Sequence, residues 1–377
     1  MVSTINYINK RGITKPWKIY PKINRKFSHA MIIPCFSEFN ELPNLLKSIE
    51  KNDAFLLKDI LIIIIINNSN KADDYIYNEN KKTYQYLKKS QFLFTIGIID
   101  AFSKGFELPN KFAGVGLARK IGMDLVLPYL SNKKSLIFST DADTVINKNY
   151  FNVIINYYNN NNVKAAVVGF QHLTKKYPTI KKIIHDYEKF LLLTAKKIKK
   201  AGSPYGYVSM GSTMVCTKDA YVAIGGMPNK KATEDFYFLQ ELTKHCGVHT
   251  ISNILVYPSA RPVSRVYLGT GYRMKQSQKG YKIQDLYYSD DSFLLLKKWI
   301  EIGTSSWQCN LNHVFDKTNA ISSSLTTFII NEHIKDIWMN LQSSAPSKFH
   351  FKHQFHRWFD GLKTIRLLKY FTFLSIF

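Results

Sequence analysis

Two aspartates, Asp141 and Asp143, stand two residues apart directly after the apolar run Leu136-Ile137-Phe138. Where a buried strand leaves a sheet, side chains with this spacing can point the same way into a cleft. Carboxylate oxygens bind hard divalent cations such as Mg²⁺ or Mn²⁺, often together with substrate phosphates. The pair therefore suggests a metal–diphosphate site, although a solvated turn with an aspartate capping the next helix fits the same residues.

A second acidic pair, Glu234 and Asp235, follows Thr233 and opens the helical stretch 236–245. Acids in a first helical turn suit the helix dipole, and Thr233 could cap this helix, so the pair needs no catalytic role. The functional interpretation is a carboxylate base at the mouth of a cleft, preceded by the glycine-bearing turn 225–228. A base has to reach the hydroxyl that it deprotonates, and a helix start beside a flexible loop can supply that geometry.

Three spaced arginines, Arg261, Arg265 and Arg273, accompany the glycine-bearing segment 269–271. Arginine suits bidentate binding of phosphate or carboxylate, and glycines allow a loop to close over a ligand. The segment is therefore either a lid that binds phosphate or an acidic acceptor, or an ordinary surface loop. Histidines near the motifs are interpreted as packed or hydrogen-bonded side chains rather than third metal ligands: His172, His245 and His249.

The chain alternates strand-like and helix-like segments, which predicts an α/β domain with a mainly parallel sheet. Continuous apolar runs predict buried strands, and helical spacing of apolar residues predicts helices. The predicted strands are 31–34 (ended by Pro34), 60–66, 92–99, 135–138 and 165–170, and the predicted helices are 41–57, 114–129, 180–201 and 236–245. Ligands of such sheets bind beyond the carboxyl ends of the strands, so 34–38, 67–69 and 141–143 can converge on one cleft.

The composition limits the class of protein and of partner. The chain has 377 residues, 45% of them hydrophobic and 21% charged, which is ample for a globular core. Its net charge of +25 favours anionic partners such as nucleotides, anionic lipid surfaces, acidic glycans or nucleic acid. Four widely separated cysteines without a Cys-x-x-Cys pair support neither zinc nor disulfides. We expect a reduced, cytoplasmic setting, with no signal peptide and no membrane span.

Five motifs, in the right order, resemble those of glycosyltransferase family 2, whose members have the GT-A fold. Three of them are Ile33-Pro34-Cys35-Phe36-Ser37-Glu38, Ile65-Ile66-Asn67-Asn68-Ser69 and Asp141-Ala142-Asp143. The others are Gly116-Leu117-Ala118-Arg119-Lys120-Ile121-Gly122 and the block 211–235, with Ala223-Ile224-Gly225-Gly226 and Thr233-Glu234-Asp235. The resemblance runs from His29 to Gly247. It implies a Rossmann-like mixed, mainly parallel sheet flanked by helices, followed by a helical or irregular C-terminal extension.

The resemblance implies inverting, metal-assisted transfer of a sugar from a nucleotide-diphosphate donor, with Mg²⁺ or Mn²⁺ as the metal. Asp235 would be the general base, and Glu234 would orient the acceptor or the base. Asp141 and Asp143 would hold the ribose and the metal, and Arg119 would steady the nucleotide. The donor-binding residues that it implies are Pro34, Cys35, Glu38, Asn67, Asn68, Arg119, Asp141 and Ala142.

The chain departs from the family pattern at a few positions. Asn67 or Asn68 stands where an acidic residue is usual, and asparagine can still hydrogen-bond a base or ribose. Ser37 replaces a common asparagine. Lys120 stands where asparagine is usual, and we expect it to add a cation near the phosphates.

We expect three parts: a basic N-terminal arm (1–28), a GT-A domain (29–265) and a C-terminal extension with a basic aromatic tail (266–377). The tail could lie on an anionic membrane surface, at the inner face of the cell membrane, or its aromatics could pack back on the catalytic domain, which we favour. Its Gln354-x-x-Arg357-Trp358 pattern matches processive polysaccharide synthases. In those enzymes the pattern lies much closer to the acidic motif, so we interpret the match as accidental.

The leading hypothesis is a glycosyltransferase that acts on a hydroxyl of a glycan or lipid-linked glycan, with no nucleic acid as partner. A sugar-phosphate nucleotidyltransferase is one alternative, but it normally needs a glycine-rich basic loop after the first strand, which 35–38 does not offer. A non-catalytic polyanion binder is the other, suggested by the net charge of +25. No recognisable nucleic-acid module supports the latter.

Overall fold

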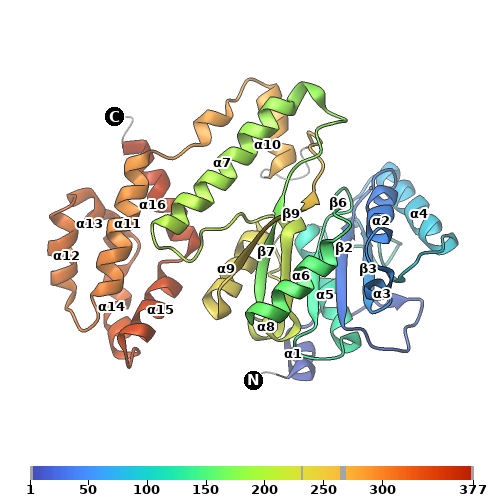
Figure 1. The fold of residues 1–377 in the computed structure, drawn as a ribbon, viewed down its shortest axis with the longest axis horizontal. Helices are drawn as coiled ribbons and strands as arrows, with labels where there is room; N and C mark the ends of the chain where they lie inside the picture. The colour runs from blue at the N-terminus through green and yellow to red at the C-terminus, as the bar shows by residue number, and fades with distance from the viewer. Residues whose placement is uncertain (1–2, 231, 264–268, 375–377) are drawn as a thin grey trace. The chain divides into compact units, whose positions relative to one another are not determined.

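The computed structural model describes residues 3–230, 232–263 and 269–374, which form two compact units (Figure 1). The sheet unit comprises Met1–His185 and Ser209–Tyr281, and the helical unit comprises Asp186–Val208 and Lys282–Phe377. This division differs from the predicted ranges, because the predicted arm belongs to the sheet unit and the chain enters the helical unit twice. Composition gives no sign of the first of these stretches, Asp186–Val208, because it begins inside one continuous helix, α7 (Lys181–Lys200).

The sheet unit is built on a mixed sheet whose described strands follow the order β1-β4-β3-β2-β5-β8-β7-β9-β6. Strands β4, β3, β2 and β5 run parallel, as do β7 and β9, while β1, β8 and β6 are antiparallel to their neighbours. The longest pairings are parallel, which confirms the predicted mixed, mainly parallel α/β sheet. The strands are β1 Ile19–Tyr20, β2 His29–Cys35, β3 Ile60–Asn67, β4 Thr95–Ala101, β5 Leu136–Ser139, β6 Val145–Ile146, β7 Ala165–Phe170, β8 Met214–Thr217 and β9 His249–Tyr257.

Strand β3 shows that helices cover both faces of the sheet. All of its 8 residues are buried, and successive side chains of a strand point to opposite faces. The helices of the sheet unit are α1 Thr4–Arg11, α2 Leu42–Glu50, α3 Ala54–Leu57, α4 Asp74–Lys89, α5 Val115–Val126, α6 Tyr150–Asn161, α8 Lys218–Ala223, α9 Glu234–Cys246 and α10 Thr270–Gln278, with the start of α7.

The predicted helix 41–57 is interrupted in the structure. Asp53 Oδ1 accepts hydrogen bonds from Phe55 N at 2.8 Å and from Leu56 N at 3.0 Å. These bonds satisfy amides at the start of a new helix, so the chain forms α2 and then the short α3.

Pro34 lies inside β2 and does not end it, contrary to the sequence prediction. Ile32 O accepts a hydrogen bond from Thr140 N at 3.2 Å, so this side of β2 faces β5. Pro34 faces the same side two residues later, where the pairing with β5 has ended. Its missing N–H therefore breaks no hydrogen bond of the sheet.

Helix α5 lies close to the sheet because position 122 is a glycine. A Cβ at Gly122 would lie 2.6 Å from Ile65 Cδ1 and 2.9 Å from Ile32 Cγ2. Both distances are well below the roughly 3.5–4.0 Å at which carbon atoms pack. Gly122 therefore sets the depth at which α5, the helix that carries Arg119, packs on β2 and β3.

The N-terminal segment is anchored to the sheet unit by the buried carboxylate of Asp124. Tyr7 of α1 and Tyr221 of α8 each donate a hydroxyl hydrogen bond to Asp124 Oδ1 at 2.7 Å. Ile13 N donates to Oδ2 at 2.8 Å, and Lys120 Nζ lies 3.1 Å from the same oxygen. We call these residues the Asp124 cluster.

The expectation that Lys120 adds a cation near the phosphates is wrong. Its ammonium is buried in the Asp124 cluster, where it also donates to the Tyr7 hydroxyl at 3.0 Å. Successive residues of a helix are turned by about 100° around the axis, so Lys120 and its neighbour Arg119 face different surroundings.

The helical unit packs its helices around an aromatic core. Besides the rest of α7, it contains α11 Asp290–Ser305, α12 Leu311–Asn319, α13 Ser323–Asn331, α14 Ile334–Ser343, α15 Lys348–Trp358 and α16 Gly361–Leu374. Phe355 and Phe359 are fully buried, with ring centroids 5.5 Å and 5.8 Å from that of Trp299. Trp358 packs on the same ring at 6.3 Å. The tail aromatics therefore pack in the core of the helical unit itself, and Phe355 and Phe359 offer no exposed face to a membrane.

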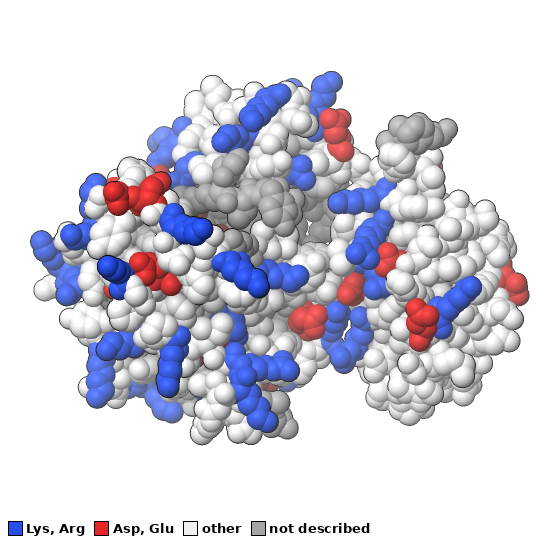
Figure 2. Space-filling model, turned by 180° about the vertical axis from the view of Figure 1, so that it is seen from behind, with Lys and Arg blue, Asp and Glu red and all other residues white. Residues whose placement is uncertain are grey.

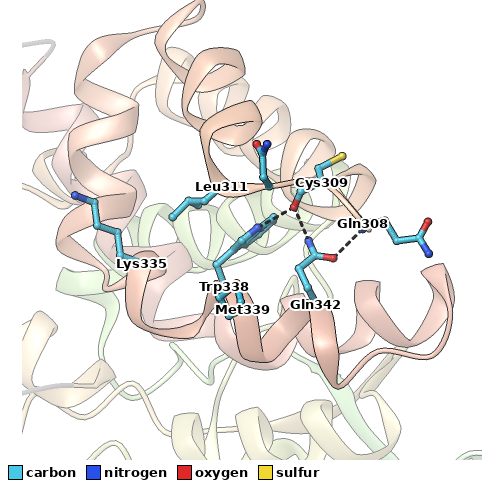
Figure 3. Close-up of a pocket in the computed structure, with 8 residues that line it drawn as sticks. Gln308, Cys309, Leu311, Lys335, Trp338, Met339 and Gln342 are labelled. Carbon is cyan, nitrogen blue, oxygen red and sulfur yellow. Dashed lines mark hydrogen bonds between the residues drawn. The ribbon is translucent and has the colours of Figure 1, made fainter.

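A loop of the helical unit is held by Gln342 of α14 (Figure 3). Gln342 Nε2 donates to Ser306 O at 2.7 Å, and its Oε1 accepts from Gln308 N at 2.7 Å. Trp338 Nε1 donates to Cys309 O at 3.0 Å, beside a cavity of about 300 Å³. Within the described ranges, no helix has both the length and the apolar composition needed to cross a bilayer.

Candidate functional site

The loops that follow β2 and β3 are tied together by Asn80, a buried residue of α4. Asn80 Oδ1 accepts a hydrogen bond from Ser37 N at 2.9 Å. Its Nδ2 donates to Asn67 O at 3.1 Å and to Asn68 Oδ1 at 2.9 Å. Sequence reasoning missed Asn80, although it stands three residues before the buried Thr83 on the same face of α4.

The two asparagines after β3 have different surroundings. Asn68 Nδ2 donates to Ser69 O at 3.0 Å and to Phe102 O at 3.4 Å, so this amide holds the loop in place. Asn67 Oδ1 is buried and accepts no hydrogen bond from the part of the chain that the structure describes. Buried acceptors normally find a partner, so Asn67 Oδ1 offers a position for a donor from a ligand or a water molecule.

Arg119 of α5 joins two acidic motifs that lie far apart in the sequence. Its side chain is 2% exposed; Nη2 donates to Asp141 Oδ1, and Nη1 donates to Glu234 Oε1. Burial alone would lower the pKa of Arg119, but the charges of Asp141 and Glu234 raise it, so the guanidinium stays charged. Gly211 leaves room for this group, since a Cβ there would lie 2.1 Å from Nη2.

Arg261, which follows β9, joins Asp143 to the loop after β2. Its Nη2 lies 2.6 Å from Glu38 Oε1 and 3.1 Å from Asp143 Oδ2. Burial alone would lower the pKa of Arg261, but the hydrogen bond and charge of Glu38, together with Asp143, raise it. The two aspartates of the first motif are thus paired with different arginines, Asp141 with Arg119 and Asp143 with Arg261.

The remaining predicted site residues lie at different positions in the fold. Arg265 lies outside the described residues. Arg273 lies in α10, where its guanidinium carbon is 5.8 Å from the centroid of the Tyr272 ring. Pro34 and Cys35 are part of β2 and pair with β3 through the backbone, and Ala142 is buried between the two aspartates.

Glu234 and Asp235 begin α9 but have unequal access to solvent. Glu234 is buried against Arg119, whereas Asp235 is partly exposed and its Oδ1 accepts a hydrogen bond from Phe236 N at 2.7 Å. Burial raises the pKa of Glu234 to about 7 and also raises the pKa of Asp235, with Arg119 opposing both shifts. Thr233 has a left-handed backbone (φ 63°) and makes no capping hydrogen bond, so the simple capping interpretation is wrong.

The site carries more negative than positive charge, although the chain as a whole is strongly basic. Five carboxylates, Glu38, Asp141, Asp143, Glu234 and Asp235, share the two guanidinium groups of Arg119 and Arg261. Figure 2 shows lysine and arginine side chains spread widely over the face that it draws, with acidic side chains in smaller groups. A diphosphate would be repelled by the carboxylates unless a cation accompanied it.

The aspartate pair fits a divalent cation only with help from a ligand. Among the described residues, no three His, Cys, Asp or Glu side chains gather closely enough to hold a metal. Mg²⁺ is commonly bound by one or two carboxylates together with substrate phosphates and water. Asp143, whose side chain is 26% exposed, fits that arrangement, with Asp141 beside it in the same loop.

The three histidines considered as further ligands have other contacts or positions. His172 Nε2 lies 3.2 Å from Thr270 Oγ1, at the start of α10. His249 Nδ1 lies 3.4 Å from the Tyr157 hydroxyl, and His245 stands in the last turn of α9. His172 is therefore buried and hydrogen-bonded, as expected, whereas His245 and His249 are exposed.

Comparison with known proteins finds similarity at the level of structure only. No family model and no curated protein matches the sequence. One similar solved structure is S. aureus TarS 1–349 in complex with UDP-GlcNAc, with a TM-score of 0.45 and 12% identity over 81% of this chain and 92% of that one. Another is the mannosyltransferase PcManGT from Pyrobaculum calidifontis in complex with GDP-Man and Mn²⁺, with a TM-score of 0.42 and 12% identity over 99% and 88%.

Proposed function

We propose that this protein is a glycosyltransferase of the GT-A type, which moves a sugar from a nucleoside diphosphate to a hydroxyl acceptor with inversion. The observation that carries the proposal is the way two arginines gather distant acidic motifs. Arg119 joins Asp141 to Glu234, and Arg261 joins Asp143 to Glu38. Asp141 and Asp143 both lie in the loop that follows β5, so this loop connects the Arg119 cluster to the Arg261 cluster.

The donor would lie against the loops after β2 and β3. The unsatisfied Asn67 Oδ1 supplies an acceptor for a base or ribose, and Asn80 fixes both loops. A divalent cation bound with Asp143 would neutralise the leaving diphosphate and act as a Lewis acid. Arg119 keeps Asp141 in position, and Glu234 in turn keeps Arg119 in position.

Asp235 would act as the general base. The acceptor oxygen bonds to the anomeric carbon, the bond from that carbon to the diphosphate oxygen breaks, and the hydroxyl proton passes to the Asp235 carboxylate. Attack from the side opposite to the leaving group inverts the anomeric centre. The exposure of Asp235 and the burial of Glu234 favour this assignment, so Glu234 is better described as positioning Arg119 than as contacting the acceptor.

Asp143→Ala and Asp235→Asn test the separate roles proposed for these two residues. UDP, GDP, ADP and CDP with Mn²⁺ are compared by thermal unfolding, because a bound nucleotide stabilises the folded chain by mass action. We expect one of them to stabilise the wild type and Asp235→Asn, but not Asp143→Ala. Transfer from the matching nucleotide sugar should fall about 100-fold or more in Asp235→Asn, the range for loss of a general base.

Asp291→Asn is the matched control, since Asp291 is an exposed aspartate in the first turn of α11 in the helical unit. It should leave both nucleotide binding and transfer unchanged. Undiminished transfer by Asp235→Asn would remove Asp235 as the base. Release of pyrophosphate from a nucleoside triphosphate and a sugar phosphate would instead favour the nucleotidyltransferase alternative.

A further inference from the structure

A second cavity lies in the sheet unit, and Asp143 is one of the residues that line it. It has a volume of about 380 Å³, at the small end of the range for ligand pockets. Four of its lining residues are lysines, from α2 and the segment after β7, and we call it the lysine pocket. It is lined by Glu41, Asn44, Lys47, Ser48, Lys51, Asp143, Val145, Leu173, Lys175, Lys176, Tyr177 and Ser259.

The lysine pocket has an excess of positive charge. Lys176 Nζ lies 2.9 Å from Glu41 Oε1, and Asp143 shares Arg261 with Glu38, so the lining has four lysines against two acids. Lys47, Lys51 and Lys175 have no carboxylate partner in the part of the chain that the structure describes. Lys47 and Lys51 stand four residues apart at the end of α2, on the same side of the helix, so one anion can contact both.

Hydrogen bonds hold one wall of the pocket, α2, against the chain that follows the aspartates. Ser48 Oγ accepts from Ile146 N at 3.1 Å, and Asn52 Nδ2 donates to Asn147 O at 3.2 Å. These bonds hold α2 beside the segment that follows Asp143.

The wall opposite α2 consists of residues 173–177 and Ser259, and hydrogen bonds connect these residues to one another and to Arg261. Leu173 N donates to Pro258 O at 2.8 Å, and Arg261 N donates to Ser259 Oγ at 3.2 Å. The ion pair of Lys176 with Glu41 closes the pocket between this wall and the start of α2. The pocket is therefore largely formed in advance, and it is joined through Arg261 to Glu38 and Asp143 of the candidate site.

We propose that the lysine pocket binds an anionic substituent of the acceptor, a phosphate or a carboxylate on a sugar. The designation as acceptor rests on the proposed function, in which the donor lies against the loops after β2 and β3. None of the pocket's lysines comes from those loops, and the small volume suits one charged sugar residue better than a nucleotide. The enzyme would thus select acidic acceptors.

The test uses the full chain and measures binding calorimetrically at low ionic strength. The probes are inorganic phosphate, glucose 6-phosphate, glucuronate and uncharged glucose. We expect the charged probes to bind more tightly than glucose, and affinity to fall about tenfold in Lys47→Gln/Lys51→Gln, as loss of two exposed charge contacts predicts. The phosphate and glucuronate arms then show which anion the pocket prefers.

Lys81→Gln/Lys89→Gln is the matched control, because both lysines are exposed on α4 of the same unit and outside the pocket. It removes the same charge and should bind the probes like the wild type. If both double variants lost the same affinity for the probes, net charge alone would explain the effect, and the proposal would be overturned. So would binding of glucose as tight as that of glucose 6-phosphate.

Nucleoside diphosphates with Mn²⁺ form the last arm. If Lys47→Gln/Lys51→Gln weakens their binding as much as that of glucose 6-phosphate, the pocket holds the donor's diphosphate and the acceptor assignment fails. If no nucleoside diphosphate binds but glucose 6-phosphate does, the anion pocket stands and the proposed function fails. If nucleoside diphosphates bind and no charged probe does, the proposed function stands and the pocket fails.

Discussion

At the scale of single residues, Glu234 is the most constrained group of the site. Its carboxylate is buried and shares Arg119 with Asp141, while Asp235 stands next to it. Burial therefore favours the neutral form of Glu234 more strongly than the arginine favours the charged form, and the pKa rises to about 7. A group of this kind links the stability of the fold to pH near neutrality.

We expect the free energy of unfolding to fall as pH rises through this range. The pKa of Glu234 rises from 4.5 in the unfolded chain to about 7 in the folded one, so the folded chain holds a proton that the unfolded chain releases. The stabilisation is complete below pH 4.5 and is lost as pH rises through about 7. Its slope is at most about 1.4 kcal/mol per pH unit.

Urea unfolding of Glu234→Gln at several pH values checks this expectation, because the amide cannot titrate and the slope should flatten. Glu241→Gln is the control, since Glu241 lies on the same helix with its side chain 48% exposed. Equal slopes in wild type and Glu234→Gln would show that Glu234 titrates normally in the folded chain.

The sequence predicted which acidic residues belong to the site, but not which partners they have. Asp141, Asp143, Glu234 and Arg119 stand in short motifs, and motifs preserve residue type and spacing. Their pairing depends on how α5, α9 and the segment after β9 approach one another, which no local pattern encodes. The roles that the motifs imply stay predictions until the variants above are measured.

At the scale of elements, the Asp124 cluster joins α1, α5 and α8. Asp124 is completely buried and accepts two hydroxyl hydrogen bonds and a backbone one, besides its ion pair with Lys120. Since α5 also carries Arg119, the cluster fixes the helix that holds the centre of the candidate site. The basic N-terminal segment is therefore part of the framework of the sheet unit.

We expect Asp124→Asn to destabilise the protein by about 3–5 kcal/mol, because it leaves the Lys120 ammonium buried without a counter-charge. Tyr7→Phe should cost about 1.5–3 kcal/mol, the range for a hydrogen bond to a charged group. Tyr75→Phe, at a tyrosine that is 69% exposed, is the control and should be neutral.

Chemical denaturation measures all three variants. Adding Lys120→Met to Asp124→Asn should recover much of the loss, because the unpaired charge is then removed as well. No recovery in the double variant would mean that the hydrogen bonds of Asp124, rather than its charge pair, dominate the cluster.

The elements that the sequence predicted well are those with continuous burial. β3 is apolar along nearly its whole length, and α7 has a clear amphipathic spacing. β1 and β6 have 2 residues each and carry no periodic signal. β9 alternates poorly between buried and exposed positions, and its pairing with β7 shifts register twice around Gly169, so its pattern does not identify a strand.

At the scale of the whole molecule, the helical unit depends on two separate stretches of chain. Ile198 and Ala201, at the end of α7, are buried in one core with Trp299, Phe355 and Phe359 from the C-terminal helices. The first stretch therefore supplies part of the apolar surface that the second one covers.

We expect Ile198→Asp to loosen the C-terminal helices, because it places a charge in their core. Hydrogen exchange followed by mass spectrometry should show faster exchange in α11, α15 and α16 than in the wild type. Lys199→Asp, at the exposed neighbouring position, should leave exchange in these helices unchanged. Equal protection in Ile198→Asp and wild type would mean that the C-terminal helices are stable without α7.

The division of the helical unit between two stretches also has a consequence for biosynthesis. During translation, the segment Asp186–Val208 leaves the ribosome before all of Ser209–Tyr281, and its partners in Lys282–Phe377 emerge last. Contacts between segments so far apart in the sequence form slowly, because a long loop has to close first. Ile198 and Ala201 therefore stay uncovered until the helices of Lys282–Phe377 have been made, and the nascent protein is open to chaperone capture until then.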